Sequence, residues 1–298
     1  MDDFKKIKMM KSNVELAAYT TFKIGGPADW FCEAFSEKEL LEAVKFAQEK
    51  KLPYFILGGG SNVLVSDLGF RGVVIRMENG EWRIGNEKII AEAGIILDKL
   101  VNIATENSLS GLEFAAGIHG TLGGAVVGNA GAWQESFGDK VERVKILDEN
   151  GQFKWLNHDE CQFVYRQSRF KKRKEIVLEV ELKLTQGDKG EIQRKMTANL
   201  KKREGQPQEP SAGSIFINPK PQSAGDLIEK CGLKGKQIGE AKISEKHANF
   251  IVNLGGAKAQ DVLKLIALAR EEVKKKFDLN LELEVVLLGE KYCAFRLV

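Results

Sequence analysis

The spacing of apolar and polar residues along the chain predicts both helices and strands. Ser36 and Glu39 have the spacing of a capping box, and the apolar residues after them recur at helical intervals until Pro53. A continuous apolar run at residues 54–57 follows, which is typical of a buried strand. We therefore predict a helix that leads into a buried strand.

The same patterns predict the remaining elements. Apolar residues alternate with mainly polar ones from Ile176 to Leu184, as in an antiparallel sheet with one exposed face. Strands are also expected at residues 72–75, 88–91, 249–254 and 281–288, and helices at residues 192–203 and 224–231, along Leu97, Leu100, Val101 and Ala104, and along a long stretch from Val262 to Phe277. In the last strand, Glu282 and Glu284 are predicted to share one face.

Residues 204–213 contain two prolines and two glycines, a composition typical of a connection between domains. We expect a hinge at residues 204–210. The predicted divisions are residues 1–70, 71–203 and 211–298. Because helices and strands are mixed in all three, the predicted fold class is α+β.

Composition excludes several classes of function. The 298 residues, 43% of them apolar, can form two or three domains with proper cores. With 45 basic and 42 acidic residues the net charge is +3, which gives no reason to expect nucleic acid, and the basic runs at residues 171–174 and 274–276 are interpreted as solvated faces. The amino terminus lacks the apolar core of a secretion signal, and no apolar run approaches about 18 residues. A cytoplasmic protein without membrane insertion is expected.

The cysteines give no sign of a disulfide framework or a metal site. Cys32, Cys161, Cys231 and Cys293 are far apart in the sequence, and they do not cluster with histidines. They are predicted to be reduced, mostly buried thiols, with no metal bound.

Two glycine-dense stretches are the strongest functional signals. The strand at residues 54–57 is followed by Gly58, Gly59, Gly60, Ser61 and Asn62. Three glycines can bring backbone N–H groups close to an anion, and the two polar side chains add donors. A tight turn between two strands is the other interpretation of this segment.

The second glycine-dense stretch covers residues 111–132. Neither stretch contains the G-x-G-x-x-G pattern of a Rossmann fold or the Gly-Lys-Ser/Thr end of a P-loop. One such loop is common, but two in one chain are not. A large phosphate-bearing ligand held by two backbone cradles is therefore expected, and a flavin dinucleotide fits that description.

Three further clusters could carry chemistry. Residues 165–170 place arginines beside aromatic residues, residues 212–219 place a serine next to a glycine, and residues 281–286 set acids into an apolar segment. Each has a structural explanation by itself, as a surface arginine, a turn serine or a solvent-facing glutamate.

Taken together, these features resemble the UDP-N-acetylenolpyruvoylglucosamine reductase (MurB) family along nearly the whole chain. The matching segments are Tyr19 to Ala28, the Gly-Gly-Gly-Ser-Asn loop, Gly111-Leu-Glu-Phe114, Gly123-Gly124, Asn129-Ala-Gly-Ala132, Tyr165-Arg166, Gly213-Ser214, Ser244-Glu-Lys-His247 and Glu284. The short interval between Arg166 and Ser214 resembles the family's shorter-loop class. This class lacks a tyrosine-bearing loop over the substrate, so the site is expected to be more open, or to close by movement about the hinge.

The resemblance implies a fold and an activity. The fold is a two-part FAD-binding unit of the vanillyl-alcohol-oxidase/PCMH type, residues 1–70 and 71–203, followed by a C-terminal substrate-binding domain at residues 211–298. The implied activity is that of a UDP-N-acetylmuramate dehydrogenase with noncovalent FAD and with NADPH as hydride donor. Its small-molecule substrate would be UDP-N-acetylglucosamine enolpyruvate, and its product a peptidoglycan precursor. A monomer is expected.

The family pattern also implies residue roles. Arg166 would stabilise negative charge on the substrate, Ser214 would donate a proton to carbon, and Glu284 would hydrogen-bond the developing enolic acid. Loss of any one is expected to cost on the order of a hundredfold in turnover. The implied cofactor-binding residues are Gly58, Gly59, Gly60, Ser61, Asn62, Gly117, Gly120, Thr121, Gly123, Gly124, Asn129 and Ala130, and the candidate substrate-binding residues are Tyr165, Asn218, Lys202 and Arg203.

The chain departs from the family pattern at His119, Gly128, Gly205, Ile217 and Val286. Lys202 and Arg203 are candidates to supply the charge missing at Gly205, and His119 could touch the flavin phosphates or attach the flavin covalently. Two other functions stay open: a protein that binds FAD without reductase activity, and an FAD-linked oxidase of the same broad fold. The first has no need of a proton donor, and the second would turn over in air without NADPH.

Overall fold

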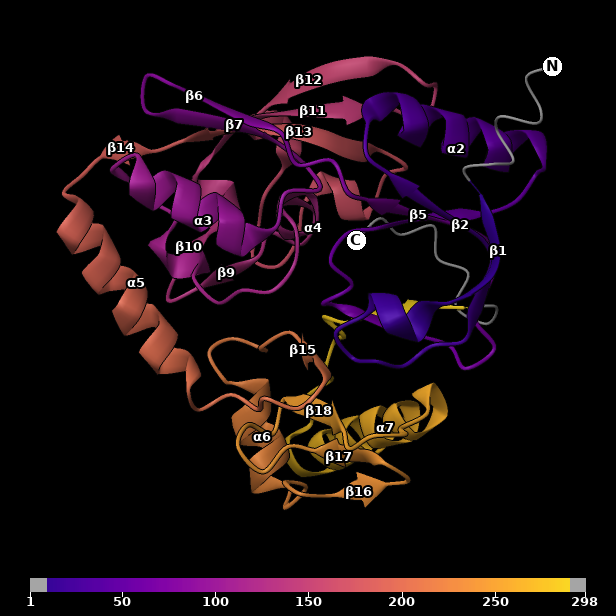
Figure 1. Cartoon of the computed structure of the whole chain (residues 1–298). Helices are drawn as coiled ribbons and strands as arrows, with labels where there is room; N and C mark the ends of the chain where they lie inside the picture. Colours follow the sequence, from indigo (N-terminus) through magenta and orange to yellow (C-terminus); the bar gives the residue numbers. More distant parts are fainter. Residues whose placement is uncertain (1–9, 290–298) are drawn as a thin grey trace.

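A four-stranded sheet organises the first part of the chain in the computed structural model, which describes residues 10–289 (Figure 1). Its strand order is β1 (Lys11–Glu15), β2 (Pro27–Ala34), β5 (Phe70–Met77) and β3 (Tyr54–Leu57). Strands β2, β5 and β3 are parallel, and β1 is antiparallel to β2. Helix α2 (Glu37–Glu49) connects β2 to β3, and Ser36 Oγ accepts the N–H of Glu39 at 3.2 Å, as the capping box predicts.

The first part extends further than predicted. The expected boundary between residues 70 and 71 falls at the start of β5, which lies between β2 and β3 in the first sheet. A boundary after Met77 would keep the four strands of this sheet together. A boundary at residue 70 would remove a central strand that connects its two neighbours.

A second, antiparallel sheet organises the next part. Its order is β12 (Phe153–Asn157), β11 (Val141–Leu147), β13 (Ile176–Lys183), β7 (Lys88–Glu92) and β6 (Trp82–Gly85). Helices α3 (Leu97–Glu106) and α4 (Leu122–Gly128) lie below this sheet in Figure 1, and α5 (Lys189–Arg203) runs along the outside. The smaller elements of the first two parts are β4 (Val63–Val65), β8 (Leu109–Ser110), β14 (Thr185–Gln186), β9 (Gly131–Ala132), β10 (Glu135–Ser136), η1 (Leu16–Tyr19), η2 (Glu113–Ala115), η3 (Phe137–Asp139), η4 (Asp159–Cys161) and η5 (Arg169–Lys171).

Strand β13 is antiparallel as predicted, but its expected exposed face is largely buried. Glu181 is 3% exposed, and it accepts hydrogen bonds from Lys88 Nζ at 2.8 Å and Arg143 Nε at 2.5 Å. The two long basic side chains reach in from the neighbouring strands and cover the polar face. The alternation of residue types therefore predicts the strand correctly and its exposure wrongly.

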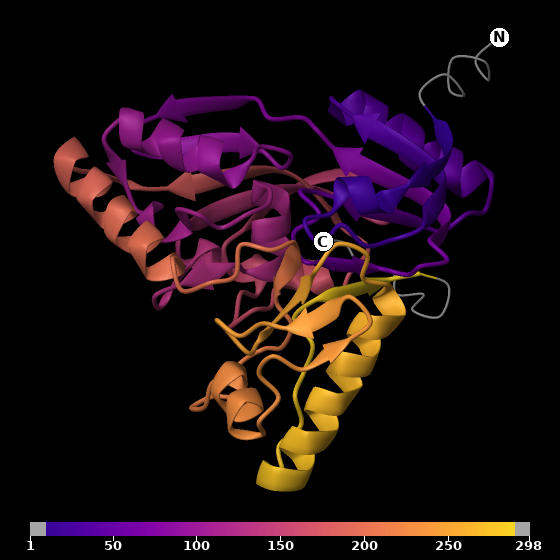
Figure 2. The same ribbon diagram turned by 60° about the horizontal axis from the view of Figure 1, so that its bottom comes forward.

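The third part follows the connection at residues 204–210. Its sheet has the order β15 (Ser211–Ser214), β18 (Phe250–Asn253), β17 (Ala241–Ile243) and β16 (Gln237–Ile238), with α6 (Ala224–Lys230) and α7 (Ala259–Phe277) packed against it. The predicted helices and the strand at residues 249–254 are confirmed. Figure 2 shows this part below the other two, with α7 along one side.

The end of the described chain returns to the first part. Strand β19 (Val286–Leu288) pairs in parallel with β4. The predicted strand at residues 281–288 is wrong over its first half, where Leu283 forms a single bridge with Phe216. Because the chain bends here, Glu282 is exposed and Glu284 is half-buried, so the two do not share a strand face.

Two large hydrophobic cores hold the three parts together. One core combines residues of both sheets of the first two parts, including Cys32 and Ile75 from the first and Ile146 and Val180 from the second. The second core belongs mainly to the third part, but Phe22, Ile24 and Leu64 of the first part are buried in it. The first part therefore packs against both of the others.

Candidate active site

The two glycine loops, far apart in sequence, lie against each other. A Cβ atom on Gly59 would come within 2.8 Å of Gly120 Cα, and one on Gly58 within 2.4 Å of Thr121 Oγ1. Ser61 Oγ donates to the carbonyl of His119 at 2.9 Å. A side chain on Gly59 would meet backbone and push the loops apart, whereas one on Gly58 would displace the Thr121 side chain.

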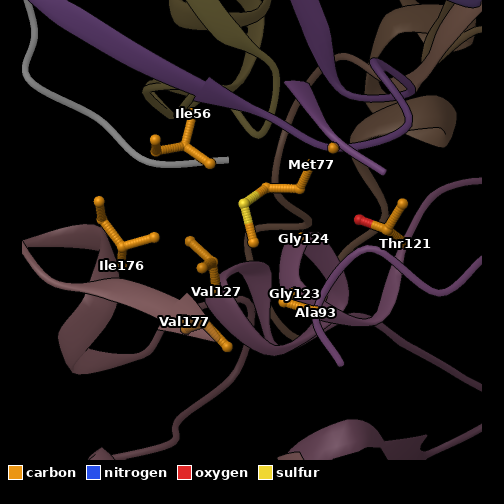
Figure 3. A pocket seen from close by; sticks show the side chains of 10 residues that line it. Ile56, Met77, Ala93, Thr121, Gly123, Gly124, Val127, Ile176 and Val177 are labelled. Carbon is orange, nitrogen blue, oxygen red and sulfur yellow. The ribbon is translucent and has the colours of Figure 1, made fainter. Parts of the chain in front are cut away.

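A pocket opens beside this junction, between the first and second parts (Figure 3). It is lined by Ile56, Gly58, Met77, Ala93, Thr121, Gly123, Gly124, Val127, Ile176 and Val177, and it is open to solvent. Its aliphatic and glycine lining suits the flat face of an aromatic ring, and backbone N–H groups of the loops lie next to it. The residues present fit a dinucleotide with ring systems and phosphates, such as FAD.

The predicted cofactor residues fall into two groups. Gly58, Thr121, Gly123 and Gly124 line the pocket, while Gly59, Ser61 and Gly120 form the contact between the loops. Gly60 packs against the backbone of Tyr19 and Thr20 instead. The others lie at the edge of this region. Gly117 packs on the side chain of Arg203, Ala130 bonds Ala125 and Phe137 through its backbone, and the side chains of Asn62 and Asn129 bond carbonyl groups of Glu284 and Val164.

Arg166 and Glu284 come from different parts of the molecule and meet. Arg166 Nε lies 2.8 Å from Glu284 Oε1, with the side chains 22% and 19% exposed. The Nε–H does not point at that oxygen, and no group within residues 10–289 accepts a hydrogen bond from it. The contact is an ion pair that leaves a buried donor unsatisfied, which is a feature of binding sites.

Burial raises the pKa of the Glu284 carboxyl above the ordinary value of glutamate. The positive charges of Arg166 and Lys171 act in the opposite direction but are weaker than the desolvation. Glu284 therefore keeps its proton to a higher pH than a glutamate in water does. A protonated carboxyl group can donate a hydrogen bond as well as accept one.

Ser214 lies at the end of β15, next to the segment that carries Glu284. The Glu284 N–H donates to the carbonyl of Ile215 at 2.9 Å, so the backbones of the two segments run side by side. Asn249 holds this segment through two bonds to Phe216, at 3.0 and 2.8 Å. Ser214 is thus placed one residue from a backbone contact of Glu284.

The Ser244–His247 motif stabilises the position of Asn249. Ser244 Oγ accepts the N–H groups of Lys246 and His247, and His247 Nδ1 accepts the N–H of Asn249 at 3.2 Å. Burial lowers the pKa of His247, which favours the neutral ring that can accept this bond. The motif positions Asn249, which in turn holds Phe216.

The candidate substrate residues are only partly gathered at the site. Tyr165 is 40% exposed beside Arg166, with Lys220 Nζ 4.2 Å from its ring centre. Arg203 is half-buried and donates to the carbonyl of Ala116 at 2.9 Å. Burial lowers the pKa of Arg203, and the positive charge of Arg166 lowers it further. The charge of Arg166 therefore acts on Arg203.

Two other candidates have structural roles. The Asn218 Oδ1 atom accepts the N–H of Ala224 at 2.9 Å, at the start of α6. Lys202 is exposed, with its Nζ 4.8 Å from the ring centre of Trp133. These two side chains are engaged by the protein near the site.

Lys171 was missed because it belongs to a run of basic residues that we interpreted as a solvated face. It is half-buried, and its Nζ donates to the carbonyl of Arg166 at 2.8 Å. Its charge also acts on Glu284. No pattern in the sequence separates Lys171 from Lys172 and Arg173, which are exposed.

The positions that depart from the family pattern differ in their surroundings. Val286 is 7% exposed in β19, His119 is exposed, and a Cβ atom on Gly128 or on Gly205 would meet nothing within 4 Å. The backbone N–H of Ile217 donates to Glu282. A side chain at Val286 therefore points into the core, where a basic residue would have to be accommodated.

Three of the four cysteines fall within the described residues. Cys32, Cys161 and Cys231 are free, and burial raises the pKa of Cys32 and of Cys161 to about 12. Cys293 lies outside the described residues. Residues 10–289 contain no group of three or more His, Cys, Asp or Glu side chains placed to hold a metal ion. Among them, no helix is both long enough and apolar enough to cross a membrane.

Two family models match the chain. One, described as "UDP-N-acetylenolpyruvoylglucosamine reductase, C-terminal domain", matches residues 206–288, and the other, described as "FAD binding domain", matches residues 28–157. These ranges correspond to the third part of the fold and to most of the first two.

Proteins named UDP-N-acetylenolpyruvoylglucosamine reductase are similar over most of their length. The one from Caldanaerobacter subterraneus subsp. tengcongensis is 45% identical over 94% of this chain and 93% of its own. The one from Halalkalibacterium halodurans is 44% identical over 95% of each chain. The crystal structure of UDP-N-acetylenolpyruvylglucosamine reductase (MurB) from Thermus caldophilus matches with a TM-score of 0.81 and 40% identity, over 94% of this chain and 99% of that one.

Proposed function

Because the chain belongs to the UDP-N-acetylenolpyruvoylglucosamine reductase family, we propose that Arg166, Ser214 and Glu284 form its catalytic group. The protein is a UDP-N-acetylmuramate dehydrogenase that uses FAD and NADPH. Its fold is the predicted one, a two-part FAD-binding unit followed by a C-terminal α+β domain. A protein that binds FAD without reducing this substrate, and an FAD-linked oxidase, are not favoured.

One observation carries the assignment of the catalytic group. The Arg166–Glu284 pair, 2.8 Å apart, joins the second and third parts of the molecule, and Ser214 lies in the segment hydrogen-bonded to Glu284. Asn62, at the end of the first glycine loop, also bonds the Glu284 carbonyl at 3.1 Å. The segments that carry Ser214 and Glu284 thus meet near the first glycine loop, and Arg166 joins them through its contact with Glu284.

When bound, FAD accepts hydride from NADPH and supplies it to the enolpyruvyl double bond. Arg166 faces the negative charge that then builds up on the adjacent carbon and the substrate carboxylate. Its guanidinium is a planar fork that matches a carboxylate. Because Arg166 is only 22% exposed, this attraction is stronger than it would be in water.

Ser214 is proposed to donate the proton that completes the lactyl ether. A hydroxyl group is a weak acid, but a carbon-centred enolate is a strong base and can take a proton from a well-placed donor. The placement comes from the backbone: Gly213 has φ of 69°, and Ile215 is fixed by its bonds to Asn249 and Glu284. The bond that forms is C–H, and the bond that breaks is the serine O–H.

Glu284 is proposed to stabilise the enolic form of the substrate carboxylate. Its raised pKa allows it to hold a proton, which it can share with a carboxylate oxygen of the substrate as charge builds up. Lys171 holds the Arg166 backbone in place, and its charge limits how far the pKa of Glu284 rises.

The binding assignments from the sequence are also proposals. FAD would be held by the loops at Gly58, Gly59, Gly60, Ser61, Gly117, Gly120, Thr121, Gly123, Gly124 and Ala130. Tyr165 is better placed than Lys202 and Asn218 to meet the substrate, since its ring contacts Arg166, and Arg203 is the other candidate, because the charge of Arg166 acts on it. We further propose three domains with boundaries near Met77 and at residues 204–210.

We also propose a monomer that makes a peptidoglycan precursor in the cytoplasm, where nucleotide sugars and NADPH are available. Light scattering of the purified protein tests the oligomeric state.

An anaerobic experiment tests the reaction directly. Purified protein should carry a flavin whose visible band bleaches on addition of NADPH and returns when UDP-N-acetylglucosamine enolpyruvate is added. Bleaching without recovery would point to the altered positions Gly205, Ile217 and Val286. Absence of any flavin would contradict the interpretation of both glycine loops.

The role of Ser214 has a more specific test. Ser214→Ala should leave bleaching by NADPH nearly unchanged and slow recovery with substrate by on the order of a hundredfold or more. Ser211→Ala, in the same strand, is the matched control and should leave both steps unchanged. If Ser214→Ala slowed both steps equally, the proton-donor role would be wrong.

A further inference from the structure

Asn129 ends helix α4 in a left-handed conformation, with φ 43° and ψ 56°. Its side chain is buried, with the residue 5% exposed. The amide is engaged at both ends: Nδ2 donates to the Val164 carbonyl at 2.9 Å, and Oδ1 accepts the Gly138 N–H at 2.8 Å. The donor and the acceptor of this buried amide both bond protein groups, so the side chain has few hydrogen-bonding groups free for a ligand.

The bond to Val164 fixes the turn that carries Arg166. Val164 and Gln167 exchange two backbone hydrogen bonds of 3.0 Å each, so the two residues between them form a tight turn. Arg166 occupies this turn with φ of 57°, a conformation that a residue with a side chain adopts only when its surroundings hold it.

The other side of the turn is held by the same helix. Ser168, which is 2% exposed, donates from Oγ to the carbonyl of Val127 at 2.7 Å. Val127 lies in α4 and lines the pocket described above. Both sides of the Arg166 turn are therefore attached to the end of α4, and three residues of the same helix, Gly123, Gly124 and Val127, line the pocket.

We propose that Asn129 is a positioning residue that sets the place of Arg166 relative to the cofactor pocket, and that its side chain does not bind the cofactor. This inference rests on the proposed role of Arg166. It replaces the cofactor-binding role that the glycine-rich motif suggests for Asn129. Helix α4 lines the pocket and also holds the Arg166 turn. The position of Arg166 therefore depends on the shape of the pocket.

The substitution Asn129→Asp separates these roles. An aspartate oxygen still accepts the Gly138 N–H, but the donor to the Val164 carbonyl is lost. The second oxygen of the aspartate then faces the Val164 carbonyl oxygen, and the two repel each other. FAD content and affinity, measured by flavin fluorescence, should stay within about twofold of the wild type, as should reduction by NADPH, while recovery of the flavin band with substrate should slow by about tenfold. Asn129→Gly, which tolerates the left-handed backbone, provides a second variant if the aspartate protein does not fold.

Asn253→Asp is the matched control. Asn253 is 6% exposed, donates from Nδ2 to the Phe22 carbonyl at 3.0 Å and accepts backbone N–H groups at Oδ1, so it has the same bonding pattern away from the Arg166 turn. It should lose stability comparably without a selective slowing of the second step.

A double-mutant cycle distinguishes positioning from a general structural effect. Arg166→Ala alone should slow recovery by on the order of a hundredfold. If Asn129 acts through Arg166, adding Asn129→Asp to Arg166→Ala should cause no more than about a twofold further change. An equal loss in both backgrounds, or loss of FAD from Asn129→Asp, would overturn the inference. An unaffected Arg166→Ala would instead overturn the proposed catalytic group.

Discussion

Glu284 shows how a single residue can combine two opposing electrostatic effects. Burial raises its pKa, and the nearby charges of Arg166 and Lys171 restrain that rise. The contact with Arg166 Nε, 2.8 Å long, holds the carboxyl group where the proposed mechanism needs it. The balance between these effects determines the pH range in which Glu284 carries a proton.

This balance predicts a pH dependence of substrate reduction. Since the pKa is raised, Glu284 stays protonated to a higher pH than ordinary glutamate, and it loses the ability to donate as the pH rises through that pKa. The rate of flavin recovery with substrate should therefore fall on the alkaline side, and Glu284→Gln, which cannot titrate, should lack this decline and be slower at low pH.

The measurement is stopped-flow recovery of the flavin band across a pH series, with reduction by NADPH as the internal control. Glu282→Gln is a matched variant, because Glu282 is the exposed neighbour two residues away. The same alkaline decline in Glu284→Gln as in the wild type would mean that another group titrates.

At this scale the sequence is informative about residue types but not about contacts. Arg166, Ser214 and Glu284 were identified through the resemblance to the family pattern, since each has an ordinary structural explanation by itself. The contact between Arg166 and Glu284 could not be derived, since it depends on how the second and third parts of the molecule are arranged. Lys171 was missed because it belongs to a basic run, residues 171–174, that we interpreted as a solvated face.

At the scale of elements, the glycine loops have a requirement that can be tested. A Cβ atom on Gly59 would lie 2.8 Å from the Gly120 Cα, and backbone cannot move aside as a flexible side chain can. Gly59→Ala should therefore separate the loops and weaken FAD binding by about tenfold or more, as expected for overpacking.

Gly128→Ala is the matched control for this prediction. A Cβ atom on Gly128 would meet nothing within 4 Å, and the residue lies in helix α4, where alanine is favoured over glycine. Titration of the apoproteins with FAD, followed by flavin fluorescence, should give an unchanged affinity for Gly128→Ala. Normal affinity in Gly59→Ala would show that the loops can separate without loss of the cofactor site.

Most elements could be predicted from periodicity, and the exceptions have physical causes. The strand Tyr54–Leu57 and the helices Glu37–Glu49 and Ala259–Phe277 follow the predicted patterns closely. Helix α4 was not predicted, because its three glycines disfavour a helix; it forms where its backbone packs against β7 and β13. Residues 281–285, before β19, have the apolar content of a strand. The chain bends there because it crosses from the third part of the molecule to the first.

At the scale of the whole molecule, the third part is attached to the first more firmly than a single hinge suggests. Strands β4 and β19 pair, Phe22 and Leu64 are buried in the third part's core, and Asn253 bonds the Phe22 carbonyl. Contacts to the second part include the Arg166–Glu284 pair and the Lys220–Tyr165 contact. Movement about residues 204–210 would therefore have to strain the contacts with the first part.

Asp67 makes one of these attachments through a helix cap supplied from another part of the chain. Its carboxylate accepts the N–H groups of Ala259 and Gln260 at 2.8 and 3.1 Å, at the start of α7. Asp67→Ala should cost about 1 kcal/mol, the usual value of an N-cap. Because this cap joins two parts, hydrogen exchange should increase in the first turn of α7 and also in β4 and β19.

Asp188→Ala provides the comparison, since Asp188 caps its own helix, α5, by accepting the Glu191 N–H at 2.9 Å. It should cost a similar free energy of unfolding but increase exchange in α5 alone. Exchange confined to α7 in Asp67→Ala would mean that the cap is purely local and that the other contacts hold the two parts together. Spread of exchange to β19 would instead place the segment carrying Glu284 under the control of that attachment, since Glu284 lies two residues before β19.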